Sequence, residues 1–380
     1  MAATVLRAAR PEDRDEAEAL AGAAFSADPP RPGPEVAGTA EVLRRVAQDP
    51  ADGRLLATST ARLCGQWWGG RRVPAIALGG VAVDLTARGR GVGRALLTDT
   101  FDAARAAGAS LVALIPSTHG FYRKAGCGIA GRRSVYAIDT HELRTLPRPA
   151  DTPAYRRATS DDVPAVAALV AAHAGRTNGV LEHDTSTGSA VQYVAVRDDV
   201  VVGWCALGRR ASERGNYTVT VLDLVGVDPA TELALWRDLV ADEPSARQVH
   251  ALLPAGSLLE HHLPRQTEPV EDATWMLGLL DVPAALAGRG YPRGVRTRLT
   301  LDVGSDVWTL DVADGSARVA AGAQPGPRVR LDLADLASVY AGHLDPLSAH
   351  HAGLLEGDEA AVESLRTLFA GPPAVLARPF

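Results

Sequence analysis

The 380-residue chain has only three cysteines and no long hydrophobic run. Cys64, Cys127 and Cys205 lie far apart and lack the spacing of a metal site, which favours a reduced, cytoplasmic protein without a bound metal. No apolar stretch reaches the ~18 residues that a membrane helix requires. The N-terminus turns acidic at once, so it does not resemble a signal peptide.

Basic residues are also few relative to acidic ones. The chain has 39 Lys and Arg against 45 Asp and Glu, which gives a formal net charge of −6. This balance argues against general nucleic-acid binding, because nucleic acids are bound by basic surfaces. It mildly favours a cationic substrate, although an ordinary soluble surface more often explains such a charge.

What the chain does contain suits two or three globular domains, with 46% hydrophobic residues. The first segment, residues 1–145, alternates helix and strand patterns. Its sequence predicts a helix over 10–25, a hairpin-like pair of strands over 53–60 and 61–70, a strand over 73–85, a helix over 91–108, a strand over 109–117, a short helix over 119–126 and a strand over 134–140.

A proline-marked linker near Thr145 leads into the second segment, residues 146–287. This segment predicts a capped helix over 159–175, a hairpin around an Asp-Asp turn over 190–210, a strand over 217–228, a helix over 230–243 and a strand over 248–254. The order of elements is that of the first segment, although the letters differ. The sequence therefore predicts two copies of one α/β architecture.

The third segment, residues 288–380, has a different pattern. Four stretches alternate like half-buried antiparallel strands, at 295–303, 306–312, 315–322 and 327–333. Three short helices are expected after them, at 333–342, 346–355 and 358–369. We therefore expect an α+β domain at the C-terminal end.

The stretch VAVDLTARGRGVGRALL, Val81 to Leu97, reads as a strand, a turn rich in arginine and glycine, and a helix start. Glycines let the backbone approach a phosphate, and the unpaired N–H groups of a helix start attract anions. The stretch matches neither a dinucleotide fingerprint nor a P-loop. Its pattern Arg88-x-x-Gly91-x-Gly93 resembles the motif that binds the pyrophosphate of acetyl-CoA in the GNAT superfamily of N-acetyltransferases.

This resemblance implies a mixed central sheet flanked by helices and an enzyme that uses acetyl-CoA as co-substrate. In GNAT enzymes the strand before the turn splays from its neighbour and pairs with the pantetheine arm. That role falls here to Val81, Ala82 and Val83, and the resemblance assigns the rest of the cofactor site to Arg88, Gly89, Arg90, Gly91, Val92, Gly93, Arg94, Ser117 and Thr118.

The second segment has a different turn, VGVDPATELALW, at the equivalent place. Asp228 would repel a phosphate, and Pro229 lacks an N–H group. We therefore expect the second GNAT-like domain to be degenerate and the chain to have one acetyl-CoA site.

The proposed chemistry needs a proton donor for the leaving thiolate, and a phenol suits that role. Tyr122, in HGFYRKAG, follows the second core strand, where GNAT enzymes often have such a tyrosine; Tyr136 is the weaker candidate. The attacking amine must also lose a proton. Asp84, the only carboxylate on the core strands, is more readily explained as a cap, and His119 is a lone loop histidine, a residue type that often serves as a base.

The whole chain resembles the Eis (enhanced intracellular survival) family of acetyltransferases. The resemblance rests on the Val81–Leu97 stretch, PSTHGFYRKAGCG, WMLGLLDVPAALAGRGY, DLASVYAGH and a terminal phenylalanine. It implies a third domain like a sterol carrier protein, whose end enters the active site, a homohexamer, and a general base at the terminal carboxylate, here that of Phe380.

The resemblance also implies acetylation of aminoglycosides, and hence antibiotic resistance. Asp28 is a candidate pocket acid and His119 a candidate substrate contact, although both depart from the family pattern. The acceptor thus stays open between a small polycationic amine and a protein lysine. A non-enzymatic lipid-binding protein is a further alternative.

Overall fold

The computed structural model describes residues 4–25, 41–182, 190–211, 217–241, 246–254, 256–265 and 267–376. Two compact units can be separated. Of the described residues, the first unit contains those up to Gly131 and residues 274–374, and the second contains those between 132 and 273 together with Val375 and Leu376. Strands β6 (Cys127–Asp139) and β12 (Pro269–Leu279) each begin in one unit and end in the other.

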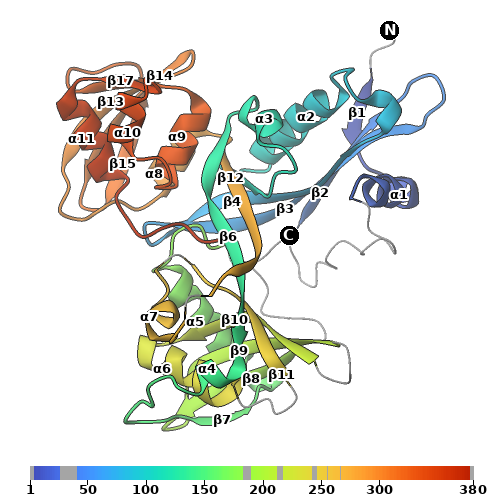
Figure 1. The fold of residues 1–380 in the computed structure, drawn as a ribbon. Coiled ribbons are helices and arrows are strands. Elements are labelled where there is room, and N and C mark those ends of the chain that lie inside the picture. The colour runs from blue at the N-terminus through green and yellow to red at the C-terminus, as the bar shows by residue number, and fades with distance from the viewer. Residues whose placement is uncertain are drawn as a thin grey trace. The chain divides into compact units, whose positions relative to one another are not determined.

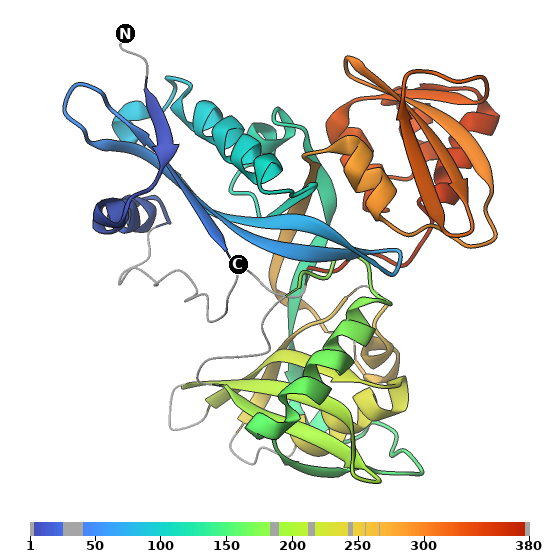
Figure 2. The same ribbon diagram turned by 180° about the vertical axis from the view of Figure 1, so that it is seen from behind.

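The first unit contains a mixed sheet (Figure 1). Its strands follow the order β1-β2-β3-β4-β5-β12, with bounds β1 (Val5–Ala8), β2 (Val42–Gln48), β3 (Leu55–Trp68), β4 (Arg71–Val83) and β5 (Leu111–Leu114). Only β4 and β5 run parallel among these neighbours. Helices α1 (Arg14–Phe25) and α2 (Val92–Ala106) cover opposite faces of the sheet, as Figure 2 also shows.

The second unit repeats this topology. Its strands follow the order β7-β8-β9-β10-β11-β6, and again only the fourth and fifth, β10 and β11, are parallel. The bounds are β7 (Ala154–Arg157), α5 (Val163–Ala174), β8 (Val191–Arg197), β9 (Val200–Ala211), β10 (Tyr217–Gly226), α6 (Pro229–Ala234), a π-helix (Leu235–Val240), β11 (Ala246–Leu252) and α7 (Leu258–His262). A short helix α4 (Thr140–Leu143) precedes them.

The sixth strand of each sheet is exchanged between the two halves of the chain. The antiparallel neighbour of β5 is the end of β12, which follows the second copy in sequence. The antiparallel neighbour of β11 is the end of β6, which follows the first copy. Each sheet is therefore completed by a strand from the other half of the sequence.

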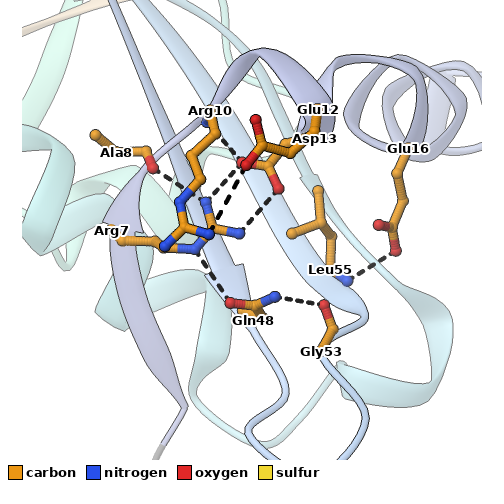
Figure 3. A network of polar contacts seen from close by, with 9 residues as sticks. All are labelled: Arg7, Ala8, Arg10, Glu12, Asp13, Glu16, Gln48, Gly53 and Leu55. Carbon is orange, nitrogen blue, oxygen red and sulfur yellow. Dashed lines mark hydrogen bonds and ion pairs between the residues drawn. The ribbon is translucent and has the colours of Figure 1, made fainter.

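An arginine–aspartate pair joins the first strand of each copy to the start of the following helix, and Figure 3 shows the pair of the first copy. Arg7 donates to both oxygens of Asp13 at 2.6 and 2.8 Å, and Asp13 also accepts from the Arg10 N–H. Arg156 and Asp162 repeat the pair at 2.7 Å for both bonds. The repeated contact supports an origin of both copies from one architecture.

The C-terminal part of the first unit has a five-stranded sheet of its own. The strand order is β15-β14-β13-β16-β17, with β13 (Thr297–Val303), β14 (Asp306–Ala313), β15 (Ser316–Ala321), β16 (Arg328–Leu331) and β17 (Leu355–Gly357). The helices here are α8 (Val282–Gly288), α9 (Leu333–Tyr340), α10 (Pro346–His351) and α11 (Glu359–Leu368). The predicted strands and helices of this segment are all found.

Aromatic rings join this C-terminal domain to the tip of the β3–β4 hairpin. Trp68 lies 5.1 Å from Tyr340 between ring centroids. Arg289 is 2% exposed, donates to the Tyr340 carbonyl at 2.6 Å, and lies over the rings of Tyr340 and Phe369. The C-terminal domain is thus packed against the first sheet.

The mixed α/β fold is as predicted, but several strands are not. The expected pair of strands over 53–60 and 61–70 is one long strand, β3, because no turn residue separates Thr60 from Ala61. The actual hairpin partner of β3 is β4, across Gly69 and Gly70. Strands β1, β2 and β12 were not anticipated. In the described ranges, no helix is long and apolar enough to cross a membrane.

Candidate active site

Strands β4 and β5 separate near their C-terminal ends. Their parallel ladder runs from Ala75–Leu111 to Leu78–Leu114, whereas β4 continues to Val83 on β3 alone. An extra residue in β4, with Gly80 at a φ of +60°, forms a bulge, which rotates a strand locally. Within the described ranges, the edge of β4 from Gly79 to Val83 has no ladder partner on the β5 side.

The open edge leads directly into the arginine-rich turn. Asp84 accepts from the Thr86 N–H at 2.8 Å, so its expected role as a cap is confirmed. Gly91 then begins α2 with a φ of +82°, a conformation that favours glycine. The first hydrogen bond of the helix is donated by the Ala95 N–H to the Gly91 carbonyl, at 3.0 Å. The three preceding N–H groups therefore lack a helical partner and form an anion-binding helix start.

Positive charge surrounds this helix start. Arg88, Arg90 and Arg94 are exposed, and none of them pairs with an acidic residue that the structure describes. Two carboxylates of the neighbouring elements are already engaged, since Asp99 pairs with Arg45 at 2.6 Å and Asp84 with Arg54 at 3.4 Å. The turn is thus suited to a polyanion such as a pyrophosphate.

Tyr122 lies on helix α3 (His119–Arg123), which follows β5 in sequence. It is 7% exposed and shares a hydrophobic cluster with Leu78, against which Val81 packs. Burial, and secondarily the neighbouring Cys127, raises the pKa of Tyr122 to about 12. Its hydroxyl has no hydrogen-bond partner among the described residues, so a protonated phenol is available to a ligand.

The other predicted site residues are distributed as follows. Ser117 and Thr118 are exposed between β5 and α3. His119, also exposed, makes a short hydrogen bond with Thr274 of β12. Asp28 and Phe380 lie outside the described residues. The structure thus brings Val81–Val83, the 88–94 turn and Tyr122 together.

The equivalent turn in the second unit has the opposite charge. Asp228 caps α6 by accepting from the Thr231 N–H at 2.7 Å, and this bond lowers the pKa of its carboxyl. Glu232 accepts from the Gly226 N–H at 3.4 Å. The separation of the two parallel strands is repeated in the second unit, because the β10–β11 ladder ends at Val221 while β10 continues to Gly226. In the second unit, carboxylates therefore accept hydrogen bonds from N–H groups of this turn, whereas the helix-start N–H groups of the first unit are left for a ligand.

Two features of the site were missed in the sequence. The bulge has a local signal, the Gly79-Gly80 pair inside a strand pattern. The ladder end has another, Pro116, which lacks the N–H that would continue the pairing.

Comparison with known proteins agrees with this geometry. Residues 5–130 match the acetyltransferase (GNAT) domain, and residues 282–377 match the sterol carrier protein domain. A Streptomyces griseus protein named as an uncharacterized N-acetyltransferase is 29% identical over 313 residues, which cover 72% of this chain and 74% of that protein.

Solved structures share the fold along the full length. A GNAT N-acetyltransferase from Kribbella flavida is 29% identical, with a TM-score of 0.82 and 99% of each chain covered. An Eis protein from Mycobacterium abscessus has a TM-score of 0.77 at 22% identity, with 100% of each chain covered.

The chain is therefore an α/β enzyme with a GNAT acetyltransferase domain and a C-terminal sterol carrier protein domain. Its enzymatic class is that of the N-acetyltransferases.

Proposed function

We propose that the enzyme transfers the acetyl group of acetyl-CoA to primary amines of a small, polycationic, aminoglycoside-like substrate, in the manner of the Eis family. The observation that carries the proposal is the arginine-flanked start of α2 at the end of an open strand edge. The net charge of −6 and the likeness in fold to an Eis protein support the acceptor class.

The residues present fit acetyl-CoA. The 88–94 turn offers to the pyrophosphate three helix-start N–H groups and three arginines that have no acidic partner among the described residues. The edge of Val81–Val83 offers backbone groups to the amides of the pantetheine arm, except for the Val83 carbonyl, which accepts from Arg88 Nε at 3.3 Å. Ser117 and Thr118 lie exposed on the far side of the strand opening. Bound there, acetyl-CoA supplies an activated thioester.

Tyr122 is assigned the role of general acid. An amine nitrogen attacks the thioester carbon, the carbon–sulfur bond breaks, and the phenol proton passes to the leaving sulfur. Burial keeps the pKa of Tyr122 near 12, so the phenol holds its proton throughout the physiological range. Negative charge develops on the sulfur as the carbon–sulfur bond breaks, and a donor placed there stabilises that charge.

The general base is assigned to the α-carboxylate of Phe380 by family resemblance alone. It would take the proton that the substrate ammonium must lose before its nitrogen can attack. The described tail ends at Leu376, which is 1% exposed. His119 is the alternative base, although its ring is already hydrogen-bonded to Thr274.

One acetyl-CoA per chain is proposed, because Asp228 and Glu232 engage the N–H groups at the equivalent turn of the second unit. We also propose a homohexamer, on the Eis resemblance. Calorimetric titration with acetyl-CoA measures the number of acetyl-CoA molecules bound per chain, and light scattering measures the number of chains in the oligomer.

The acceptor is tested by measuring kcat/KM with acetyl-CoA against aminoglycosides and against lysine peptides of matched charge. The proposal predicts a clear preference for aminoglycosides. A preference for the peptides would indicate that the enzyme acetylates protein lysines instead. No turnover with either acceptor would refute both the aminoglycoside and the protein-lysine proposals. Tyr122→Phe serves as the control for turnover at this site.

A further inference from the structure

Helix α3, which bears Tyr122, is attached to the C-terminal domain by the next residue in sequence. Arg123 Nη2 donates to both oxygens of Asp335 on α9, at 2.9 and 3.0 Å. It also reaches Asp332 at 3.4 Å. The segments 119–123 and 332–340 are far apart in sequence, yet both belong to the first unit.

The aspartate of this pair lies in an unusual environment for a carboxylate. Asp335 is 3% exposed, and burial raises the pKa of its carboxyl. In the described part of the chain, Arg123 is the only cation that pairs with it. A buried carboxylate of this kind depends on its partner, because an unpaired buried charge is strongly unfavourable. The pair therefore fixes Arg123 firmly to α9.

Backbone packing holds the same two segments together. The start of β6, which follows α3 closely in sequence, passes so near α9 that a Cβ atom on Gly128 would lie 1.9 Å from the Ala334 carbonyl oxygen. Helix α3 itself has only five residues, and a helix that short is not stable without tertiary contacts. Its orientation is consequently set by what it packs against.

We propose that Arg123 and Asp335 are positioning residues, through which the C-terminal domain aligns the Tyr122 hydroxyl with the reacting thioester. This inference rests on the proposed role of Tyr122 as general acid. The C-terminal domain would then contribute to catalysis by positioning the general acid, Tyr122. This contribution is separate from the role of the chain end as a general base.

Asp335→Asn tests the proposal with little change in shape. The α9 cap is retained, since Asp332 accepts from the Asp335 N–H. We expect kcat to fall about tenfold, a fraction of the ~100-fold or more that a well-placed acid contributes, because a misplaced group loses part of its effect. The Kd of acetyl-CoA should stay within about twofold, since the 88–94 turn is untouched.

Asp302→Asn is the matched control. Asp302 is a buried aspartate of the same domain, 6% exposed, and it pairs with Arg328 at 2.7 Å far in sequence from α3. Asp302 also pairs with Arg330 at 3.2 Å, so the control variant loses at least as much ion pairing as Asp335→Asn, but only Asp335→Asn should lower kcat. Amide hydrogen exchange should likewise accelerate in residues 119–123 only for Asp335→Asn. Equal effects of the two variants on kcat would overturn the proposal.

The Tyr122→Phe background separates positioning from general damage. If Asp335 acts through the phenol, adding Asp335→Asn to Tyr122→Phe should lower kcat no further. An equal additional loss in that background would refute positioning while leaving the acid role intact. If Tyr122→Phe alone left kcat unchanged, the acid role itself would fail, and the positioning proposal with it.

Discussion

The variant Gly91→Asp would place a negative charge in the 88–94 turn of the first unit, as Asp228 does in the equivalent turn of the second unit. A side chain fits there, because a Cβ on Gly91 would meet no atom within 4 Å. The φ of +82° costs about 1–2 kcal/mol for a side chain, and Asn has almost the same shape and tolerance as Asp. Gly91→Asn is therefore the matched control, and the difference between the two variants isolates charge.

The size of that difference follows from Coulomb's law. Two unit charges ~4 Å apart repel by about 1 kcal/mol in water and by about 4 kcal/mol at an effective dielectric constant near 20. A pyrophosphate carries about two negative charges, so the aspartate should weaken binding by at least ~2 kcal/mol relative to asparagine. This corresponds to about 30-fold in the Kd of acetyl-CoA.

Isothermal titration calorimetry at low and high salt measures this effect. The ratio of the two Kd values should shrink in 1 M salt, where the Debye length falls to about 3 Å. Equal Kd values for Gly91→Asp and Gly91→Asn at low salt would show that the pyrophosphate does not bind at the start of α2.

Three further outcomes are expected. Tyr122→Phe should lower kcat ~100-fold or more in steady-state assays, with the melting temperature almost unchanged, because the hydroxyl makes no hydrogen bond with a described residue. A residue added after Phe380 should abolish turnover while acetyl-CoA still binds by calorimetry, and full activity would argue against the terminal carboxylate. Arg7→Gln should lower the free energy of unfolding at neutral pH. Because Arg7 depresses the pKa of Asp13 to about 2, this stabilisation is present above pH ~4 and is lost towards pH 2, so urea titrations of both proteins should converge there.

The sequence was most informative where chemistry is local. The strand, turn and helix around Gly91 follow from residues that are adjacent in sequence, and so does the cap at Asp84. The degenerate turn at Asp228 could also be recognised, since a carboxylate and a proline at a helix start exclude an anion for local reasons. The predicted domain boundaries at 145 and 287 stay a prediction.

Non-local features could not be anticipated. The exchange of β6 and β12 depends on pairing between strands far apart in sequence, and a period-2 pattern does not specify its partner. The length of β3 is not specified locally, because two adjacent alternating segments are compatible both with one long strand and with a pair of strands. The Arg123–Asp335 pair has no sequence signal, because its residues lie on different elements of different segments.

The most direct test of the account is mass spectrometry of an aminoglycoside after incubation with acetyl-CoA and enzyme, with Gly91→Asp and Gly91→Asn in parallel. The account predicts products with one acetyl mass for each modified amine, formed by the unmodified enzyme and strongly reduced for Gly91→Asp relative to Gly91→Asn. Unmodified aminoglycoside in every reaction, or equal product with the two variants, would contradict it.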